Sequence, residues 1–215
     1  MLLSSDEPLS FPRCPKRLGF YPVVPDADWV EKLLLLGVRT IQIRVKTLSG
    51  AALRQELARA VRLGNDFGAR VFINDHWQLA IELAAYGVHL GQEDIQGANL
   101  AAISRAGLRL GISTHGYFEL LRAEALEPSY VALGAIFPTT TKVMPTAPQG
   151  LDKLAHYCRL LPHRPKVAIG GINMDNASSV LACGPDSLAV VRAVTESEDL
   201  DACVGYFLKL CGAGG

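Results

Sequence analysis

Polar and apolar side chains alternate in the run Ile41–Lys46. Successive side chains of an extended strand point to opposite faces, so Gln42, Arg44 and Lys46 share one face of such a strand. An arginine turned toward covering helices would lose its hydration without gaining a partner, and we therefore expect the polar face to point inward, toward the open end of the fold. Two cations that converge there would bind an anion such as a phosphate, although Lys46 could instead be a solvated loop residue.

Two aspartates follow the next two strand-like runs. Asn74 and Asp75 come directly after Val71–Ile73, and Asp94 follows Val88–Leu90. If these runs are adjacent parallel strands, their carboxyl ends bring the two carboxylates together. Magnesium binds one or two protein carboxylates, keeps several waters and takes phosphate oxygens of the substrate, so the pair predicts one Mg²⁺ that holds a phosphorylated substrate. Taken singly, each aspartate could equally be a helix N-cap.

The longest irregular stretch, residues 137–150, offers further contacts to phosphate. Its three successive threonines, Thr139, Thr140 and Thr141, present hydroxyl groups, and Lys142 adds a point charge. Loops of this length inside a compact domain are often functional, although loops rich in threonine and proline can also be inert.

The charges of these candidates favour a diphosphate. Arg44, Lys46 and Lys142 supply three positive charges and Mg²⁺ supplies two, against two negative charges on Asp75 and Asp94. A diphosphate carries about −3, by extension from the phosphate monoester. It would balance this set of groups, whereas a single phosphate would leave an excess of positive charge.

These residues lie at the ends of regularly repeated elements. Apolar runs predict strands at 18–24, 39–45, 69–74, 87–90, 109–113, 130–135, 166–169 and 187–192, and helical patterns follow them at 28–36, 49–66, 77–85, 97–106, 116–125, 149–161, 173–182 and 196–211. Eight strand–helix units predict a closed (β/α)8 TIM barrel, which forms its active site at the carboxyl ends of the strands. The alternative is an open, doubly wound sheet, but no Gly-x-Gly-x-x-Gly motif follows the first strand.

A barrel places a second phosphate position at its last two units. Gly170 and Gly171 follow the seventh strand, and Val191 and Arg192 end the eighth. Phosphate sites of such barrels are often formed by the loops after strands seven and eight, where glycines let the backbone approach the anion. We expect the amides of Gly171, Val191 and Arg192 to bind a monophosphate there.

Local signals set the expected boundaries. Ser49 and Asn173 are expected N-caps of their helices. The barrel is expected to be one domain over residues 18–211, preceded by a mobile N-terminal extension at 1–17 and followed by a flexible tail at 212–215.

The composition excludes several classes of function. The 215 residues include 21 basic and 21 acidic side chains, so no net charge attracts nucleic acid or a membrane surface. No apolar stretch approaches the ~20 residues of a membrane span. Five widely spaced cysteines without a Cys-x-x-Cys pair fit a reducing cytoplasm. We expect a cytoplasmic protein whose partners are small molecules, and a homo-oligomer stays open.

The sequence does not indicate nucleophilic catalysis. Ser113 has no evident partner other than His115, and His89, inside an apolar run, is interpreted as a hydrogen-bonded core residue. The lack of a clear acid–base pair suits a reaction driven by stabilisation of a departing anion.

Taken together, the motifs resemble those of the thiamine-phosphate synthase family. They are Gln-x-Arg-x-Lys at 42–46, Ile-Asn-Asp at 73–75, Gly-x-His-Leu-Gly-Gln-x-Asp at 87–94, Gly-x-Ser-Thr-His at 111–115, Pro-Thr-x-Thr-Lys at 138–142, Ala-Ile-Gly-Gly-Ile at 168–172 and Ala-Val-Val at 189–191. The resemblance implies a barrel transferase that joins hydroxymethylpyrimidine diphosphate to thiazole phosphate, giving thiamine phosphate and diphosphate. It also implies a dissociative reaction, in which diphosphate leaves before the thiazole nitrogen attacks.

The resemblance further implies a role for each candidate residue. Arg44, Lys46, Asn74 and Lys142 would hold the diphosphate, Asp75 and Asp94 the Mg²⁺, Gln42 and Ser113 would lie near the aminopyrimidine, and Thr139, Thr141 and the amides of Gly171, Val191 and Arg192 would bind the thiazole phosphate. Arg44, Lys46, Ser113 and Lys142 would be the catalytic groups. One departure is Arg192, since the family commonly has serine after Ala-Val-Val.

Two alternatives stay open. A thiazole tautomerase of the same superfamily would transfer a proton and need no diphosphate clamp. A catalytically silent barrel would bind thiamine phosphates without turnover. The complete Gln-x-Arg-x-Lys motif and the paired aspartates favour the synthase.

Overall fold

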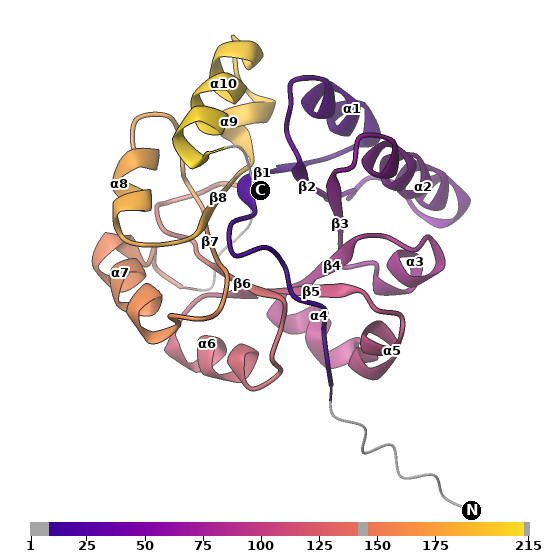
Figure 1. Cartoon of the computed structure of the whole chain (residues 1–215), viewed down its shortest axis with the longest axis horizontal. Helices are drawn as coiled ribbons and strands as arrows, with labels where there is room; N and C mark the ends of the chain where they lie inside the picture. Colours follow the sequence, from indigo (N-terminus) through magenta and orange to yellow (C-terminus); the bar gives the residue numbers. More distant parts are fainter. Residues whose placement is uncertain (1–8, 142–145, 213–215) are drawn as a thin grey trace, which may run out of the picture.

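The computed structural model describes residues 9–141 and 146–212, and in it eight parallel strands close into one barrel (Figure 1). The strands are β1 (Gly19–Val24), β2 (Thr40–Ile43), β3 (Arg70–Asn74), β4 (Gly87–Leu90), β5 (Arg109–Thr114), β6 (Tyr130–Leu133), β7 (Lys166–Ile169) and β8 (Ser187–Val190). Each strand pairs with the next in the chain, and β8 pairs with β1. The predicted single-domain (β/α)8 barrel is therefore confirmed, and an open sheet is excluded.

Helices surround the barrel on its outer face (Figure 1). They are α1 (Ala27–Leu35), α2 (Gly50–Asp66), α3 (Trp77–Glu82), α4 (Gln92–Gly97), α5 (Leu100–Arg105), α6 (Tyr117–Glu124), α7 (Gly150–Leu160), α8 (Ala177–Ala182), α9 (Arg192–Thr195) and α10 (Leu200–Cys211). Within the described ranges, no helix is both long and apolar enough to cross a membrane.

Two short helices, α4 and α9, were not predicted. Each directly follows a strand, where the sequence suggested only a loop or a longer strand. Val191 and Arg192 do not extend β8, because α9 begins at Arg192. A helix of four residues is too short to show a periodic pattern of apolar side chains.

The two expected N-caps differ in outcome. Ser49 does precede α2, without a capping bond from its side chain. Asn173 is not an N-cap, because α8 starts at Ala177. The Asn173 side chain instead accepts hydrogen bonds from the amides of Asp175 and Asn176, at 3.0 and 3.1 Å, and forms a turn.

The strands separate two apolar layers. The larger layer lies between strands and helices and contains Ile41, Ile43 and Val45. The smaller layer fills the barrel interior, with Tyr21 among its members. Gln42, between the outward-facing isoleucines, is 4% exposed and donates to the Tyr21 hydroxyl, so the alternation predicted for this strand is present.

The segment before β1 crosses the amino-terminal end of the barrel (Figure 1). Phe11 and Cys14 are buried, the Ser129 hydroxyl donates to the Pro12 carbonyl at 2.7 Å, and the Leu18 amide donates to the Ser187 hydroxyl at 2.8 Å. The expected mobile extension is thus wrong for residues 9–17, which close the barrel interior from below. Residues 1–8 and 213–215 lie outside the described residues.

Candidate active site

A cavity of about 680 Å³ opens at the carboxyl ends of the strands, and all eight strands contribute to its lining. The predicted residues in its wall are Gln42, Arg44, Lys46, Asn74, Asp75, Asp94, Ser113, Thr139, Thr141, Gly171, Val191 and Arg192. Thr140 is not among the lining residues, and Lys142 lies outside the described residues. Predicted residues from Gln42 to Arg192, far apart in the chain, therefore meet in one cavity, as the barrel requires.

Lys46 and Asp75 form an ion pair on one side of the cavity. The Lys46 ammonium lies 2.6 Å from a carboxylate oxygen of Asp75. Asp75 has a left-handed backbone (φ 62°), a conformation that aspartate tolerates better than most residues. Its amide donates to the His89 carbonyl at 2.9 Å. This turn directs the carboxylate at the end of β3 into the cavity.

Asp94 lies beside this pair, in the first turn of α4. Its side chain accepts from the Gly91 amide at 3.2 Å. Burial and the neighbouring Asp75 charge raise the pKa of the Asp94 carboxyl. Burial also acts to raise the pKa of Asp75, but the hydrogen bond and charge of Lys46 outweigh it and leave that pKa below its usual value. Two adjacent carboxylates thus share one nearby cation.

The donor set around these carboxylates fits magnesium. Within residues 9–141 and 146–212, no group of three or more histidine, cysteine or acidic side chains could hold a metal alone. Magnesium differs from zinc in this respect, because it binds through one or two carboxylates and completes its shell with water and phosphate oxygens. Asp75 and Asp94 are such a pair, in a cavity that also contains Arg44.

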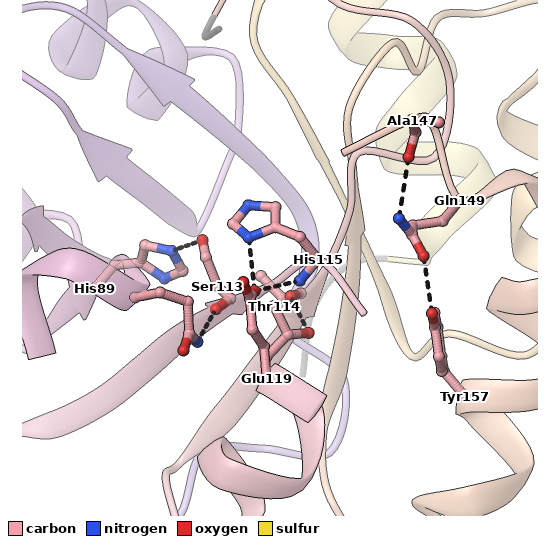
Figure 2. Close-up of polar contacts among 10 residues, drawn as sticks. His89, Ser113, Thr114, His115, Glu119, Ala147, Gln149 and Tyr157 are labelled. Carbon is pink, nitrogen blue, oxygen red and sulfur yellow. Dashed lines mark hydrogen bonds and ion pairs between the residues drawn. The ribbon is translucent and has the colours of Figure 1, made fainter. Parts of the chain in front are cut away.

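Ser113 has a histidine partner that sequence reasoning missed. Figure 2 shows the His89 ring beside the Ser113 hydroxyl, with 2.8 Å between Nε2 and Oγ. His89 is indeed hydrogen-bonded and 6% exposed, as expected of a core residue, but it also lines the cavity. Its apolar neighbours Val88 and Leu90 belong to the outer layer, so the period-two argument used for Gln42 would have placed His89 inward.

His115 lies at the next turn and is held by α6. Its amide and Nδ1 both contact the Glu119 carboxylate, at 2.7 and 2.8 Å (Figure 2). His115 also lines the cavity. It does not contact Ser113 by a hydrogen bond, so the one partner proposed for that serine is replaced by His89.

Hydrogen bonds of Gln149 hold the carboxyl-terminal end of the loop that follows β6. The Gln149 amide donates to the Ala135 carbonyl at 2.8 Å, and its side chain bridges the Ala147 carbonyl and the Tyr157 hydroxyl (Figure 2). At the near end, the Thr141 amide donates to the Thr139 hydroxyl at 3.3 Å. Thr139 and Thr141 line the cavity, and they lie on a loop whose far end is held by Gln149.

Gly171 brings the loop after β7 against the loop after β6. It has a left-handed backbone (φ 65°), and a side chain there would lie 2.6 Å from the Pro138 carbonyl oxygen and 2.7 Å from the Phe137 side chain. Only glycine fits this approach. The backbone of Gly171 thus lines the cavity next to Thr139, as a phosphate cradle would need.

Arg192 completes the wall on this side. Its guanidinium donates to the Thr140 hydroxyl and to the Glu196 carboxylate. Half of its side chain is exposed. Because α9 starts at Arg192, the first amides of that helix have no acceptor within it.

The fold and the cavity together define a (β/α)8-barrel protein with two candidate anion-binding regions. One contains Arg44 and Lys46, which follow β2, and the paired acids after β3 and β4, and the other contains the backbone after β7 and β8. Comparisons with known proteins agree with this class.

Residues 20–194 match the family described as thiamine monophosphate synthase. Thiamine-phosphate synthase of Neisseria meningitidis serogroup B is 55% identical over 202 residues, covering 94% of this chain and 98% of that protein. The enzyme of Klebsiella pneumoniae is 52% identical over 204 residues, covering 95% and 97%. The structure of thiamine phosphate pyrophosphorylase from Pyrococcus furiosus superposes with a TM-score of 0.79 at 31% identity, over 92% of this chain and 96% of that one. The chain belongs to the thiamine monophosphate synthase family, and it is an enzyme of the transferase class.

Proposed function

We propose that this enzyme joins hydroxymethylpyrimidine diphosphate to thiazole phosphate and releases diphosphate and thiamine phosphate. The observation that supports this proposal is that the residues of both candidate anion-binding regions line one cavity. Arg44, Lys46 and the two aspartates line one side, and Gly171 and the start of α9 line the other. Two phosphorylated substrates, one of which loses diphosphate, would use both regions.

The reaction needs no proton transfer. The carbon–oxygen bond to the diphosphate breaks, and its electron pair leaves with the diphosphate. The thiazole nitrogen lone pair then forms the new carbon–nitrogen bond to the pyrimidine methylene carbon. Arg44 and Lys46 would stabilise the departing charge. Arg44 and Lys46 line the cavity together with the carboxylates of Asp75 and Asp94, which agrees with this assignment.

Magnesium is expected at Asp75 and Asp94. When bound, it would neutralise charge on the diphosphate and so favour its departure. Lys46 forms an ion pair with the Asp75 carboxylate. When Mg²⁺ binds that carboxylate, the lysine would turn to the diphosphate. Asn74, 8% exposed at the end of β3, would add an amide donor to the same anion. Lys142 stays a sequence-based candidate for that anion.

Two alternatives make different demands on the cavity. A tautomerase would need a positioned base, and a silent binding barrel would need no charge clamp. The Lys46–Asp75–Asp94 group favours the synthase over both, since three ionised groups side by side are costly to maintain in a partly buried site without a charged substrate.

The deciding experiment measures diphosphate release. Purified protein would receive both substrates with and without Mg²⁺, and then each substrate alone. We expect release that requires both substrates and the metal, with thiamine phosphate as the product. Metal-independent isomerisation of a thiazole substrate would indicate the tautomerase, and tight thiamine phosphate binding without release would indicate the silent barrel.

A cytoplasmic location is part of the same proposal. It is supported by the five cysteines, Cys14, Cys158, Cys183, Cys203 and Cys211, all of which are free thiols. Homo-oligomer formation remains a prediction, testable by light scattering.

A further inference from the structure

A chain of hydrogen bonds crosses the barrel interior beneath the cavity. The Gln42 side-chain nitrogen donates to the Tyr21 hydroxyl at 3.4 Å, and the Tyr21 and Tyr130 hydroxyls lie 2.8 Å apart. The Tyr130 hydroxyl lies 2.8 Å from Nδ1 of His89, and Nε2 of that ring lies 2.8 Å from the Ser113 hydroxyl. The two ends of the chain, Gln42 and Ser113, both line the cavity.

The burial of the two tyrosine hydroxyl groups requires an explanation. Tyr21 and Tyr130 are 1% and 0% exposed, and they pack against Phe72 with ring centroids 5.6 and 5.3 Å away. A buried hydroxyl costs free energy unless it is hydrogen-bonded, whereas phenylalanine fills the same space without that cost. Burial also holds the pKa of both phenols above the usual value. Both groups therefore remain protonated and can donate.

Gly111 makes the central contact possible. In the strand register, Gly111 of β5 lies between His89 of β4 and Tyr130 of β6. A side chain at position 111 would overlap the ring and the hydroxyl of Tyr130. The missing side chain lets the tyrosine ring pass over β5 and reach His89, two strands away.

The donors and acceptors set a direction along the chain. The Gln42 amide nitrogen can only donate, so Tyr21 accepts from it and gives its own proton to Tyr130. Tyr130 then donates to Nδ1 of His89, which leaves the ring proton on Nε2, facing Ser113. In the opposite direction, the protons of Tyr21 and of the Gln42 amide would face one another. With Nε2 as donor, Ser113 accepts and directs its own proton into the cavity.

We propose that Tyr21, Tyr130 and His89 are positioning residues that present Ser113 as a hydrogen-bond donor, and the Gln42 carbonyl oxygen as an acceptor, to the substrate. The ligand that matches is a heterocycle with an amine group next to an acceptor ring nitrogen, as in an aminopyrimidine. This inference rests on the proposed function and deepens it, because it assigns the orientation of one substrate to a network that does not itself touch the reacting atoms.

The test compares two tyrosine-to-phenylalanine variants. Tyr130→Phe removes the hydroxyl at the centre of the chain. Tyr86→Phe is the matched control, since its ring also packs against Phe72, at 5.2 Å, but its hydroxyl is not part of the chain. We expect Tyr130→Phe to raise KM for the pyrimidine diphosphate by about tenfold, to leave KM for thiazole phosphate within about twofold, and to lower kcat. Equal kinetics of the two variants would overturn the proposal.

A second measurement determines the direction of the hydrogen bonds along the chain. Nitrogen-15 NMR of labelled histidine, with the His89 signals identified by their loss in His89→Asn, shows which ring nitrogen carries the proton. We expect Nε2 in the wild-type protein and a mixture of tautomers in Tyr130→Phe. A wild-type proton on Nδ1 would contradict the chain as assigned.

The NMR measurement also separates this inference from the proposed function. It needs only the folded wild-type protein, so it decides the direction of the chain even if no diphosphate is released. Should Tyr130→Phe fail to fold, Tyr21→Phe breaks the neighbouring link and gives the same expected rise in KM for the pyrimidine substrate. An unchanged KM in folded Tyr21→Phe would count against the proposal.

Discussion

The Lys46 ammonium and the Asp75 carboxylate lie 2.6 Å apart, at the ends of adjacent strands. Each is also a candidate to bind something else, the lysine a diphosphate and the aspartate a Mg²⁺. In the proposed reaction, this ion pair separates when the substrate and the metal bind. The pair thus keeps two functional charges compensated before substrate and metal bind.

Substitution of Lys46 tests this exchange of partners. Lys46→Ala removes a cation that would stabilise the departing diphosphate, and we expect kcat/KM for diphosphate release to fall by about 10²- to 10³-fold. Arg54→Ala is the control, because Arg54 and Glu82 form an ion pair of the same 2.6 Å length on the outer helices. Comparable losses in both variants would show that the effect is structural.

The Asp94 carboxylate is predicted to lower the stability of the metal-free protein at neutral pH. Its pKa is raised in the folded state by burial and by the Asp75 charge, so its contribution to stability is complete below its unfolded pKa and is lost as the pH rises through the folded value. At pH 7, Asp94→Asn should therefore raise Tm of the metal-free protein by about 1–3 °C, since partly exposed like charges repel weakly.

The same variant should lose its response to magnesium. Addition of MgCl₂ is expected to raise Tm of the wild-type protein but not of Asp94→Asn, as measured by scanning calorimetry. Glu198→Gln is the control, since it changes the net charge equally at an exposed position. If Asp94→Asn kept the full response, this aspartate would not be a metal ligand.

Arg192 is expected to strengthen binding of the thiazole phosphate. Its guanidinium reaches Thr140, across 52 residues of sequence, and lines the cavity near Gly171. Arg192→Ser should raise KM for thiazole phosphate by about 3- to 10-fold, the range of a partly exposed charged contact, with KM for the pyrimidine substrate unchanged. Arg192→Lys keeps the charge, and its KM for thiazole phosphate should lie between those of the wild-type enzyme and Arg192→Ser. Identical affinity in Arg192→Ser would leave only the backbone amide as a ligand.

Cys14 is predicted to be an unreactive thiol. Burial raises its pKa to about 12, against a smaller opposing effect of Arg109 and Arg70. Folding favours the neutral thiol, so its stabilising effect is complete below the unfolded pKa and is lost as the pH rises toward 12. At pH 8, the thiolate fraction falls by roughly a thousandfold relative to an ordinary cysteine. A thiol reagent should therefore label Cys14 only after unfolding, as mass spectrometry would show, and rapid labelling of the native protein would contradict this.

Much of the site could be predicted because it depends on local periodicity. Alternation in Ile41–Val45 is enough to place Gln42 and Arg44 on the inner face, and the barrel then fixes which end of each strand forms the cavity. The short helix α9 and the Asn173 turn were not predictable in this way. Each spans too few residues for a repeating pattern, and side-chain bonds from neighbouring residues decide its geometry.

The sequence by itself determined the eight-unit barrel, the working end of its strands and the residue types found there, because these follow from repeats and from the two-residue period of a strand. Only the tertiary structure decided which side chains contact one another. It paired Ser113 with His89 rather than His115, and Arg192 with Thr140. Such contacts join residues that are distant in the chain, and they depend on strand register and on the space left by residues such as Gly111, which no local pattern records.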